Sequence, residues 1–137
     1  MTPQTQPAIV IVVTADLLFL ARLQEACVAS GWRVQHALSV DEAALRVRLE
    51  GIRMVIYDAE TPGLPWQQAL PFLGDTCILL GSPVMDEFLW QDVVRCGGYD
   101  VIATSATPEQ MVRTLRFAWS WTLRRKLPLL SQESKGG

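Results

Sequence analysis

Ile52-Arg-Met-Val-Ile-Tyr-Asp58-Ala-Glu-Thr-Pro-Gly63 is an apolar run that ends in a carboxylate and then a Pro-Gly turn. The run has the length and the β-branched content of a buried strand. In an open parallel α/β sheet, ligands bind at the edge where the strands end. Asp58 is therefore the first candidate for a functional residue, and the rest of the chain must supply its surroundings.

The remainder of the sequence alternates between strand-length apolar runs and longer amphipathic segments. Capping signals mark several helix ends, among them Gly31, the Ser39–Glu42 capping box and Thr107-Pro108. Five repeats of strand and helix imply a parallel sheet with right-handed crossovers and helices on both faces. The predicted strands are 8–13, 32–38, 52–58, 76–80 and 101–103, and the predicted helices are 17–30, 39–51, 66–73, 86–96 and 107–126.

Length and composition indicate one compact domain. The chain has 137 residues, of which 50% are hydrophobic, and a formal charge of -2 with a pI of about 5.3. We expect a disordered tail at 1–7, one domain at 8–126 and a tail at 127–137. A clustered basic face is the mark of nucleic-acid binding. The basic cluster at 124–126 is short and lies at a helix end, so we expect no nucleic-acid binding by this domain.

The cysteines and the apolar segments indicate a cytoplasmic protein. Cys27, Cys77 and Cys96 are odd in number, widely spaced and set among apolar residues, as expected of reduced core thiols. No segment reaches the roughly 18 uninterrupted apolar residues of a membrane span. Residues 1–7 are polar and uncharged, unlike a signal peptide.

Three motifs in this order resemble the receiver domain of bacterial two-component response regulators. Asp58, followed four and five residues later by Pro62 and Gly63, looks like the phosphoacceptor motif of that family. Ser82 falls where the family has its switch Ser or Thr, and the stretch 96–100 resembles its Gly-Ala-Asp-Asp segment. The resemblance covers residues 8–126 and implies a flavodoxin-like (βα)5 three-layer sandwich with strand order 2-1-3-4-5. It also implies a phosphorelay signalling domain whose partner is a histidine kinase or another signalling protein. The sequence has no Gly-rich phosphate loop, Ser-His-Asp arrangement or metal-ligand cluster, so we expect that the chain is not an enzyme.

The sequence departs from the family at the positions that support phosphorylation. Receivers have two adjacent acidic residues after the first strand, which hold Mg²⁺; here the matching residues are Thr14 and Ala15. The family's lysine after the last strand is matched by Thr104. The segment between Asp58 and Ser82 is also short, so a trimmed third helix is expected. These departures indicate a degenerate pseudo-receiver with no cofactor or with weakly bound Mg²⁺.

Other polar residues near these motifs have two interpretations each. Asp16 is either the N-cap of the helix that starts at Leu17 or, together with Asp58 and the Glu60 carbonyl, a ligand of Mg²⁺. The Glu60 side chain is either near the pocket mouth or simply solvated. Ser82 precedes Pro83 and is equally explained as a turn residue. His36 is interpreted as a strand residue rather than a catalytic base or a metal ligand.

Aromatic residues on the last two predicted helices suggest a contact surface. Phe117 and Trp121 lie off the apolar stripe that packs the last helix on the sheet, and Trp90 and Val94 lie on the preceding helix. Such residues are enriched in interface cores, although single exposed aromatics are also common. The resemblance makes this surface a candidate for dimerisation or for docking of an output domain.

Two hypotheses of function follow from these residues. The first is a degenerate receiver that acts mainly through protein contacts. The second is a working receiver that is phosphorylated on Asp58 by a partner histidine kinase and switches through Ser82. A distant third is a flavodoxin-like domain that binds a small ligand in the same pocket.

Overall fold

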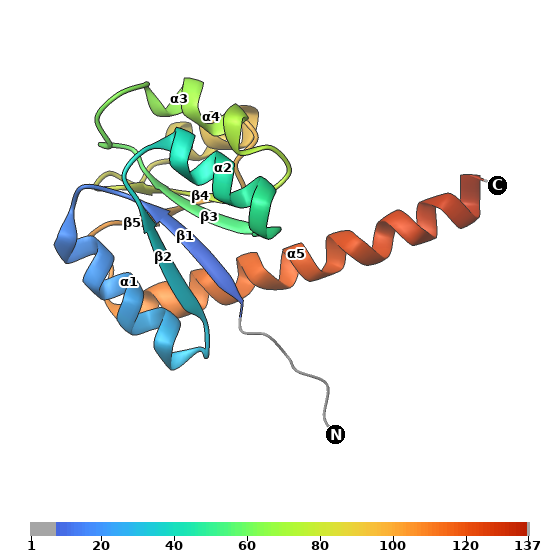
Figure 1. The fold of residues 1–137 in the computed structure, drawn as a ribbon, viewed down its shortest axis with the longest axis horizontal. Helices are drawn as coiled ribbons and strands as arrows, with labels where there is room; N and C mark the ends of the chain where they lie inside the picture. Colours follow the sequence, from blue (N-terminus) through green and yellow to red (C-terminus); the bar gives the residue numbers. More distant parts are fainter. Residues whose placement is uncertain (1–7, 137) are drawn as a thin grey trace.

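The computed structural model describes residues 8–136, with side chains through residue 124. The predicted N-terminal tail at 1–7 lies outside the described residues. Five parallel strands form one sheet in the order β2-β1-β3-β4-β5, as Figure 1 shows. This confirms the predicted fold class and strand order. The strands are β1 (Ile9–Val13), β2 (Arg33–Ala37), β3 (Met54–Asp58), β4 (Cys77–Ser82) and β5 (Asp100–Ala103).

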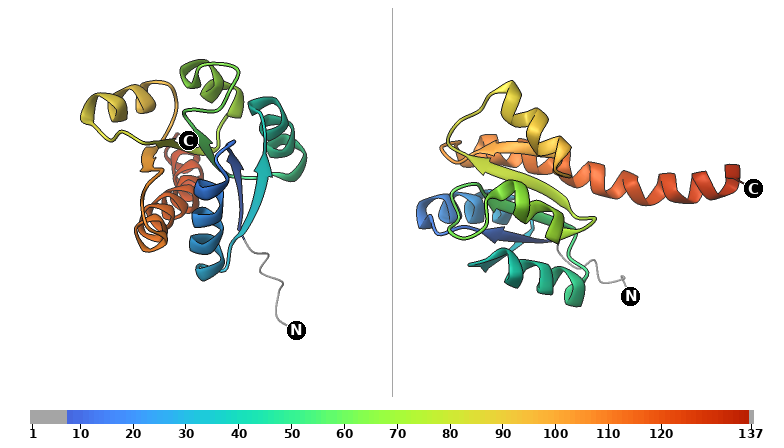
Figure 2. Two further views of the ribbon diagram at one scale, coloured as in Figure 1. Left: turned by 90° about the vertical axis from the view of Figure 1, so that its left-hand side faces the viewer. Right: turned by 90° about the horizontal axis from the view of Figure 1, so that it is seen from above.

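Helices cover both faces of the sheet. Figure 2 (left) views the sheet along its strands, with α1 and α5 on one face and α2, α3 and α4 on the other. All five strands end at the edge nearest the viewer in that panel. The helices are α1 (Leu17–Ala29), α2 (Val40–Glu50), α3 (Trp66–Ala69), η1 (Leu70–Leu73), α4 (Glu87–Arg95) and α5 (Pro108–Gly136).

Two helices differ from their predicted bounds. The segment 66–73 is four residues of α-helix followed by a 3₁₀ turn, because Pro71 has no amide to donate to the preceding turn. This is the trimmed third helix that the short segment predicts. The predicted tail at 127–137 is wrong for residues 127–136, since the backbone of α5 continues to Gly136. Six of these ten residues are Leu, Gln, Glu or Lys, which are good helix formers.

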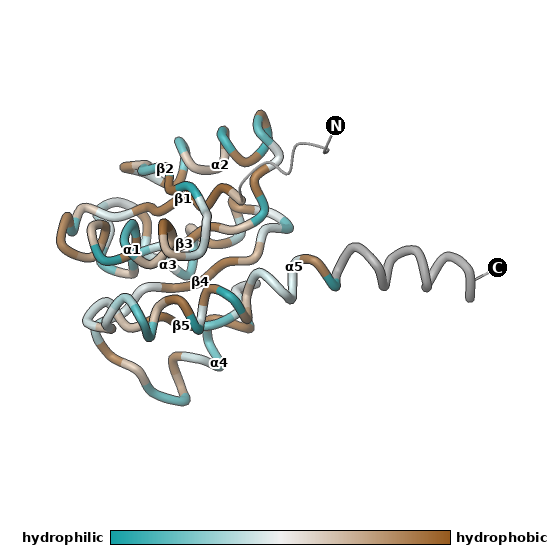
Figure 3. Tube along the Cα trace, turned by 90° about the horizontal axis from the view of Figure 1, so that it is seen from below, coloured by the Kyte–Doolittle hydropathy of each residue, from teal (hydrophilic) through white to brown (hydrophobic). Residues whose placement is uncertain are grey.

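The sheet separates two apolar clusters. Alternate residues of β1 and β3 face opposite sides, so that Val12 and Ile56 contribute to the cluster under α1 and α5. Val13 and Tyr57 contribute to the cluster under α2, η1 and α4. Figure 3 shows brown along the strands and a mixture of brown, white and teal along the helices. Because β1, β3 and β4 are covered on both faces, they are almost entirely apolar, with Asp58 and Ser82 as the polar last residues of β3 and β4.

Burial shifts the pKa of two groups in these clusters. Cys27 is fully buried between α1 and the sheet, and desolvation raises the pKa of its thiol to about 12. Burial, and secondarily the charge of Asp58, raise the pKa of Tyr57. Both groups are therefore neutral in the folded protein at physiological pH.

The three thiols should react at different rates. Cys27 and Cys77 are buried whereas Cys96, at the end of α4, is partly exposed. We expect iodoacetamide at pH 8 to alkylate Cys96 first in the folded protein, and all three thiols in denaturant, as counted by intact mass. A Cys96→Ser variant should lose the fast phase. Fast alkylation of Cys27 in the folded state would contradict the burial described above.

The raised pKa of Cys27 predicts how the unfolding free energy changes with pH. The folded state favours the protonated Cys27 thiol, so its contribution is present below the ordinary thiol pKa of about 8.5. It is lost as pH rises from there towards about 12. Cys27→Ala should flatten this part of the curve of unfolding free energy against pH.

Candidate functional site

Asp58 lies where the sequence predicts it, at the carboxyl end of a buried strand. All five residues of β3 are buried, and Asp58 itself is only 4% exposed. Its neighbour in the register of β4 is Gly81. A buried carboxylate is costly unless hydrogen-bond donors surround it, so the neighbours of Asp58 determine what the site can do.

Both oxygens of the Asp58 carboxylate accept a hydrogen bond from the protein. The Thr14 hydroxyl donates to Oδ2 at 2.6 Å, and the Glu60 amide donates to Oδ1 at 2.9 Å. The Thr14 hydroxyl also accepts from the Asp16 amide at 2.9 Å. A neutral side chain therefore bonds to Asp58 from a position where the resemblance implies a metal-binding acid.

Asp16 and Ala15 do not supply the missing charge. Asp16 Oδ1 accepts from the amides of Leu18 and Phe19 at 3.0 and 3.1 Å, so this residue is the N-cap of α1. Ala15 has no ligand atom in its side chain. The capping interpretation of Asp16 is confirmed by these contacts.

Among the described side chains, Asp58 is the one carboxylate placed to bind Mg²⁺ at this site. Nowhere between residues 8 and 124 do three His, Cys, Asp or Glu side chains group as metal ligands. Near Asp58, Glu60 is exposed at the surface, Asp16 caps α1 and Thr14 contributes a neutral hydroxyl. Mg²⁺ is usually held by one or two carboxylates plus phosphate and water oxygens in near-octahedral geometry, and only the Asp58 carboxylate is in position.

Ser82 closes a turn at the end of β4. Its hydroxyl donates to the Val84 carbonyl at 2.7 Å and accepts from the Val84 amide at 3.1 Å. This is the turn role predicted as one alternative for the residue. The hydroxyl would have to leave both partners before it could bind a phosphoryl oxygen.

Thr104, the residue that matches the family lysine in the sequence, accepts a hydrogen bond at its backbone carbonyl. The Arg22 guanidinium of α1 donates to the Thr104 carbonyl, while its Nε is buried without a partner among the described residues. A Cβ on Gly81 would lie 2.9 Å from the Phe19 ring and 3.5 Å from the Thr104 methyl. The ring therefore packs directly on the backbone of β4, which requires glycine there.

Sequence reasoning missed Arg22 and Phe19. Both belong to the segment Leu17–Leu23, in which Arg22 is the only charged residue. A lone charge within an apolar helix is the signal that would have identified it. The reach of its side chain to the loop after β5 depends on the tertiary fold and has no signature in the sequence.

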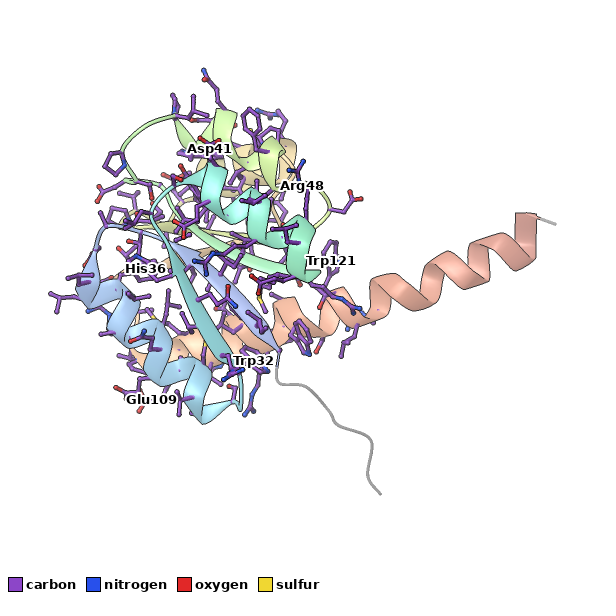
Figure 4. All side chains as sticks on the ribbon, in the orientation of Figure 1. Trp32, His36, Asp41, Arg48, Glu109 and Trp121 are labelled. Atoms are coloured by element: carbon purple, nitrogen blue, oxygen red, sulfur yellow. The ribbon has the colours of Figure 1, made fainter. Side chains whose placement is uncertain are left out.

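His36 lies beside this network. Its Nε2 is 2.7 Å from the Thr14 carbonyl oxygen, and it is partly buried on the edge strand β2. Because a carbonyl oxygen accepts, that ring nitrogen carries the proton. His36 thus has a structural partner in the loop after β1, and Figure 4 labels it on β2.

The candidate interface residues differ in exposure. Phe117 is 65% exposed, and Trp90 and Val94 are also exposed. Trp121 is partly buried and packs on Tyr99, with ring centroids 5.0 Å apart. Phe117 also borders a hollow of about 400 Å³ along α5. Phe117 is therefore available for contact. Trp121 instead packs α5 against Tyr99, the residue just before β5.

Comparison with known proteins defines the fold. No family model matches the sequence, and no curated protein sequence matches it. Solved structures match with high similarity in shape and low identity. The chemotaxis response regulator CheY4 of Vibrio cholerae has a TM-score of 0.73 and 17% identity, over 82% of this chain and 99% of that one.

Two further structures agree with it. A response regulator from Thermotoga maritima has a TM-score of 0.72 and 20% identity, over 84% of this chain and 99% of that one. A CheY-like receiver domain protein from Methanospirillum hungatei has a TM-score of 0.75 and 11% identity, over 88% and 99% of the two chains. The chain therefore has the flavodoxin-like fold of response-regulator receiver domains.

Proposed function

We propose that this chain is an atypical receiver-like domain of a bacterial two-component phosphorelay, acting mainly through protein contacts. It is not an enzyme, and its Mg²⁺ and phosphorylation site is incomplete. The observation that carries the proposal is the 2.6 Å hydrogen bond from Thr14 to Asp58. We expect the domain to act in the cytoplasm. No helix in the described part of the chain is long and apolar enough to cross a membrane.

The chemistry of phosphoryl transfer supports this proposal. Transfer depends on positioning and on neutralisation of charge, which a divalent ion and a lysine supply. Two unit charges about 4 Å apart interact by roughly 4 kcal/mol at an effective dielectric constant of 20. Replacement of two acids by Thr14 and Ala15 should therefore lower Mg²⁺ affinity by orders of magnitude. The hydroxyl of Thr14 also occupies a lone pair of Asp58 that an incoming ion or phosphorus atom would use.

The surroundings of Ser82 and Thr104 also support an incomplete phosphorylation site. The Ser82 hydroxyl is held by Val84, and the Thr104 carbonyl is held by Arg22. A phosphoryl group on Asp58 would thus meet neither a free hydroxyl nor the expected ammonium. The energy available for a phosphorylation-driven change is correspondingly smaller.

The working receiver remains the second candidate. Asp58 keeps its place at the strand end, and Gly63 adopts a positive φ of 113° in the turn that follows Pro62. These features preserve the acceptor motif in shape. In that case a partner histidine kinase would phosphorylate Asp58.

Phosphorylation chemistry separates the two candidates. We expect no aspartyl adduct after incubation with acetyl phosphate and Mg²⁺, measured by intact mass, because Thr14, Ala15 and Thr104 replace the two acids that would bind the ion and the lysine. Beryllofluoride with Mg²⁺ should likewise leave tryptophan fluorescence unchanged. A stable adduct that Asp58→Asn abolishes would instead establish the working receiver.

Restoring the missing charges should restore the chemistry. In the variant Thr14→Asp/Ala15→Asp/Thr104→Lys we expect Mg²⁺ affinity to rise at least about a hundredfold, from two added carboxylates at roughly 4 kcal/mol each before desolvation. The measurement is calorimetric titration with Mg²⁺, followed by acetyl phosphate labelling. Thr14→Asn/Ala15→Asn/Thr104→Lys is the matched control, with similar size but no added acid. Equal Mg²⁺ affinity of the two variants would contradict the electrostatic account.

The exposed aromatic surface predicts a homodimer. We expect Phe117→Glu to convert a dimer to a monomer in sedimentation velocity without changing the melting temperature, because the side chain is 65% exposed. Trp121→Glu should in addition lower the unfolding free energy by about 1–3 kcal/mol, since it removes the contact with Tyr99. A monomeric unmodified chain would count against this surface as a dimer interface.

A further inference from the structure

Exposed apolar side chains gather at the edge of the sheet where the strands end. Phe88 is 79% exposed and Leu18 is 72% exposed. They belong to a group that lies in the loops, or in the first helical turns, after β1, β2, β3 and β4. The group comprises Leu17, Leu18, Leu38, Leu64, Val84, Met85 and Phe88. Because parallel strands end at one edge, the topology places these side chains around Asp58, on the side that faces the viewer in Figure 2 (left).

The same edge is strongly anionic. The segments 14–18, 38–42, 59–66, 83–88 and 104–109 follow the five strands and contain no Lys or Arg. Their acidic residues are Asp16, Asp41, Glu42, Glu60, Asp86, Glu87 and Glu109. The opposite edge, where the strands begin, carries both signs of charge instead, with Arg33, Arg53 and Arg95 as well as Glu50 and Asp75 at or beside the strand starts. Figure 4 shows this polarity along α2, which has Asp41 at one end and Arg48 at the other.

Helix capping explains only part of this charge. Asp16 and Asp86 cap α1 and α4, and Glu42 pairs with Arg46 at 2.9 Å. The remaining four, Asp41, Glu60, Glu87 and Glu109, are exposed and make no side-chain hydrogen bond or ion pair within the described part of the chain. The N-termini of the four longer helices supply about half a positive charge each. With Arg22, whose guanidinium reaches the Thr104 carbonyl, and Arg46, which pairs with Glu42, the positive charge is near four, against seven carboxylates, so the edge stays anionic.

Capping also does not explain the apolar residues of the edge. Helix starts favour polar residues, yet the first turn of α1 exposes Leu17 and Leu18, and the first turn of α4 exposes Phe88. Apolar patches of this kind on a domain surface mark sites of protein contact. Nucleic acids and anionic membranes are disfavoured because they carry the same sign of charge as the edge.

We propose that this edge docks an α-helix of a partner protein whose apolar face is flanked by Lys and Arg. The inference rests on the proposed function, in which signalling proceeds by protein contact, and it names the partner chemistry of the same site. The leucines and Phe88 would contact the apolar face, as apolar surfaces do when they recognise amphipathic helices. The carboxylates would pair with the flanking cations and accelerate association.

A model helix tests the proposal directly. The probe is an 18-residue amphipathic peptide of Leu and Lys, labelled for fluorescence anisotropy, and its partner control replaces every Lys with Glu. We expect the full chain to bind the Leu/Lys peptide with an affinity that falls as salt rises, and to leave the Leu/Glu peptide unbound. Equal binding of both peptides would overturn the role of charge.

Matched variants locate the binding surface. Phe88→Ser should weaken binding roughly tenfold, as for a central interface residue, whereas Leu49→Ser, at a similarly exposed site (75%) near the end of α2, should not. Glu60→Lys/Glu87→Lys should weaken it by a similar factor, whereas Glu25→Lys, in the middle of α1, should not. Equal loss in the control variants would overturn the location. If the chain self-associates and the edge variants abolish that self-association, the edge binds a second copy of the chain and the proposed partner helix is rejected.

The outcome is independent of the test of phosphorylation. An adduct on Asp58 together with localised peptide binding would reject the incomplete site and keep the docking edge. No adduct together with no binding would reject the docking edge and keep the incomplete site.

Discussion

A buried carboxylate without a cation must be satisfied by neutral donors, and this requirement shapes the whole site. Asp58 ends a strand that is covered on both faces, so water cannot reach it freely. Thr14 and the Glu60 amide supply the donors. The Thr14 hydroxyl accepts in turn from the Asp16 amide, and the backbone carbonyl of Thr14 accepts from His36. The geometry of the loop after β1 is thereby tied to the strand end of β3.

The fold was predictable because each of its signals is local. β-branched runs, the Ser39 box and the glycine at position 51 are read directly from neighbouring residues, and five repeats leave few topologies. The positions of Asp58 and Ser82 followed from the same pattern. Their hydrogen bonds did not, because the partner of Asp58 is 44 residues away in sequence. The contact between Arg22 and Thr104 spans 82 residues and was missed for the same reason.

The end of α5 was predicted wrongly for a different reason. The sequence around Pro128 combines a helix breaker with strong helix formers on both sides, and we predicted a tail from residue 127. The structure continues the helical backbone to Gly136. Exposure was also hard to predict: Phe117 and Trp121 are four residues apart on one helix, yet only Phe117 is well exposed, because Tyr99 of the preceding loop packs on Trp121.

The Thr14 hydroxyl both accepts and donates a hydrogen bond, and this dual role has a thermodynamic consequence. A pair of acids at positions 14 and 15 would place like charges beside Asp58, and that repulsion would be relieved only by an ion or a bound proton. A hydroxyl creates no such repulsion. On the proposed function, the native state needs no metal to relieve repulsion at Asp58, and we expect its folding free energy not to depend on the supply of divalent ions.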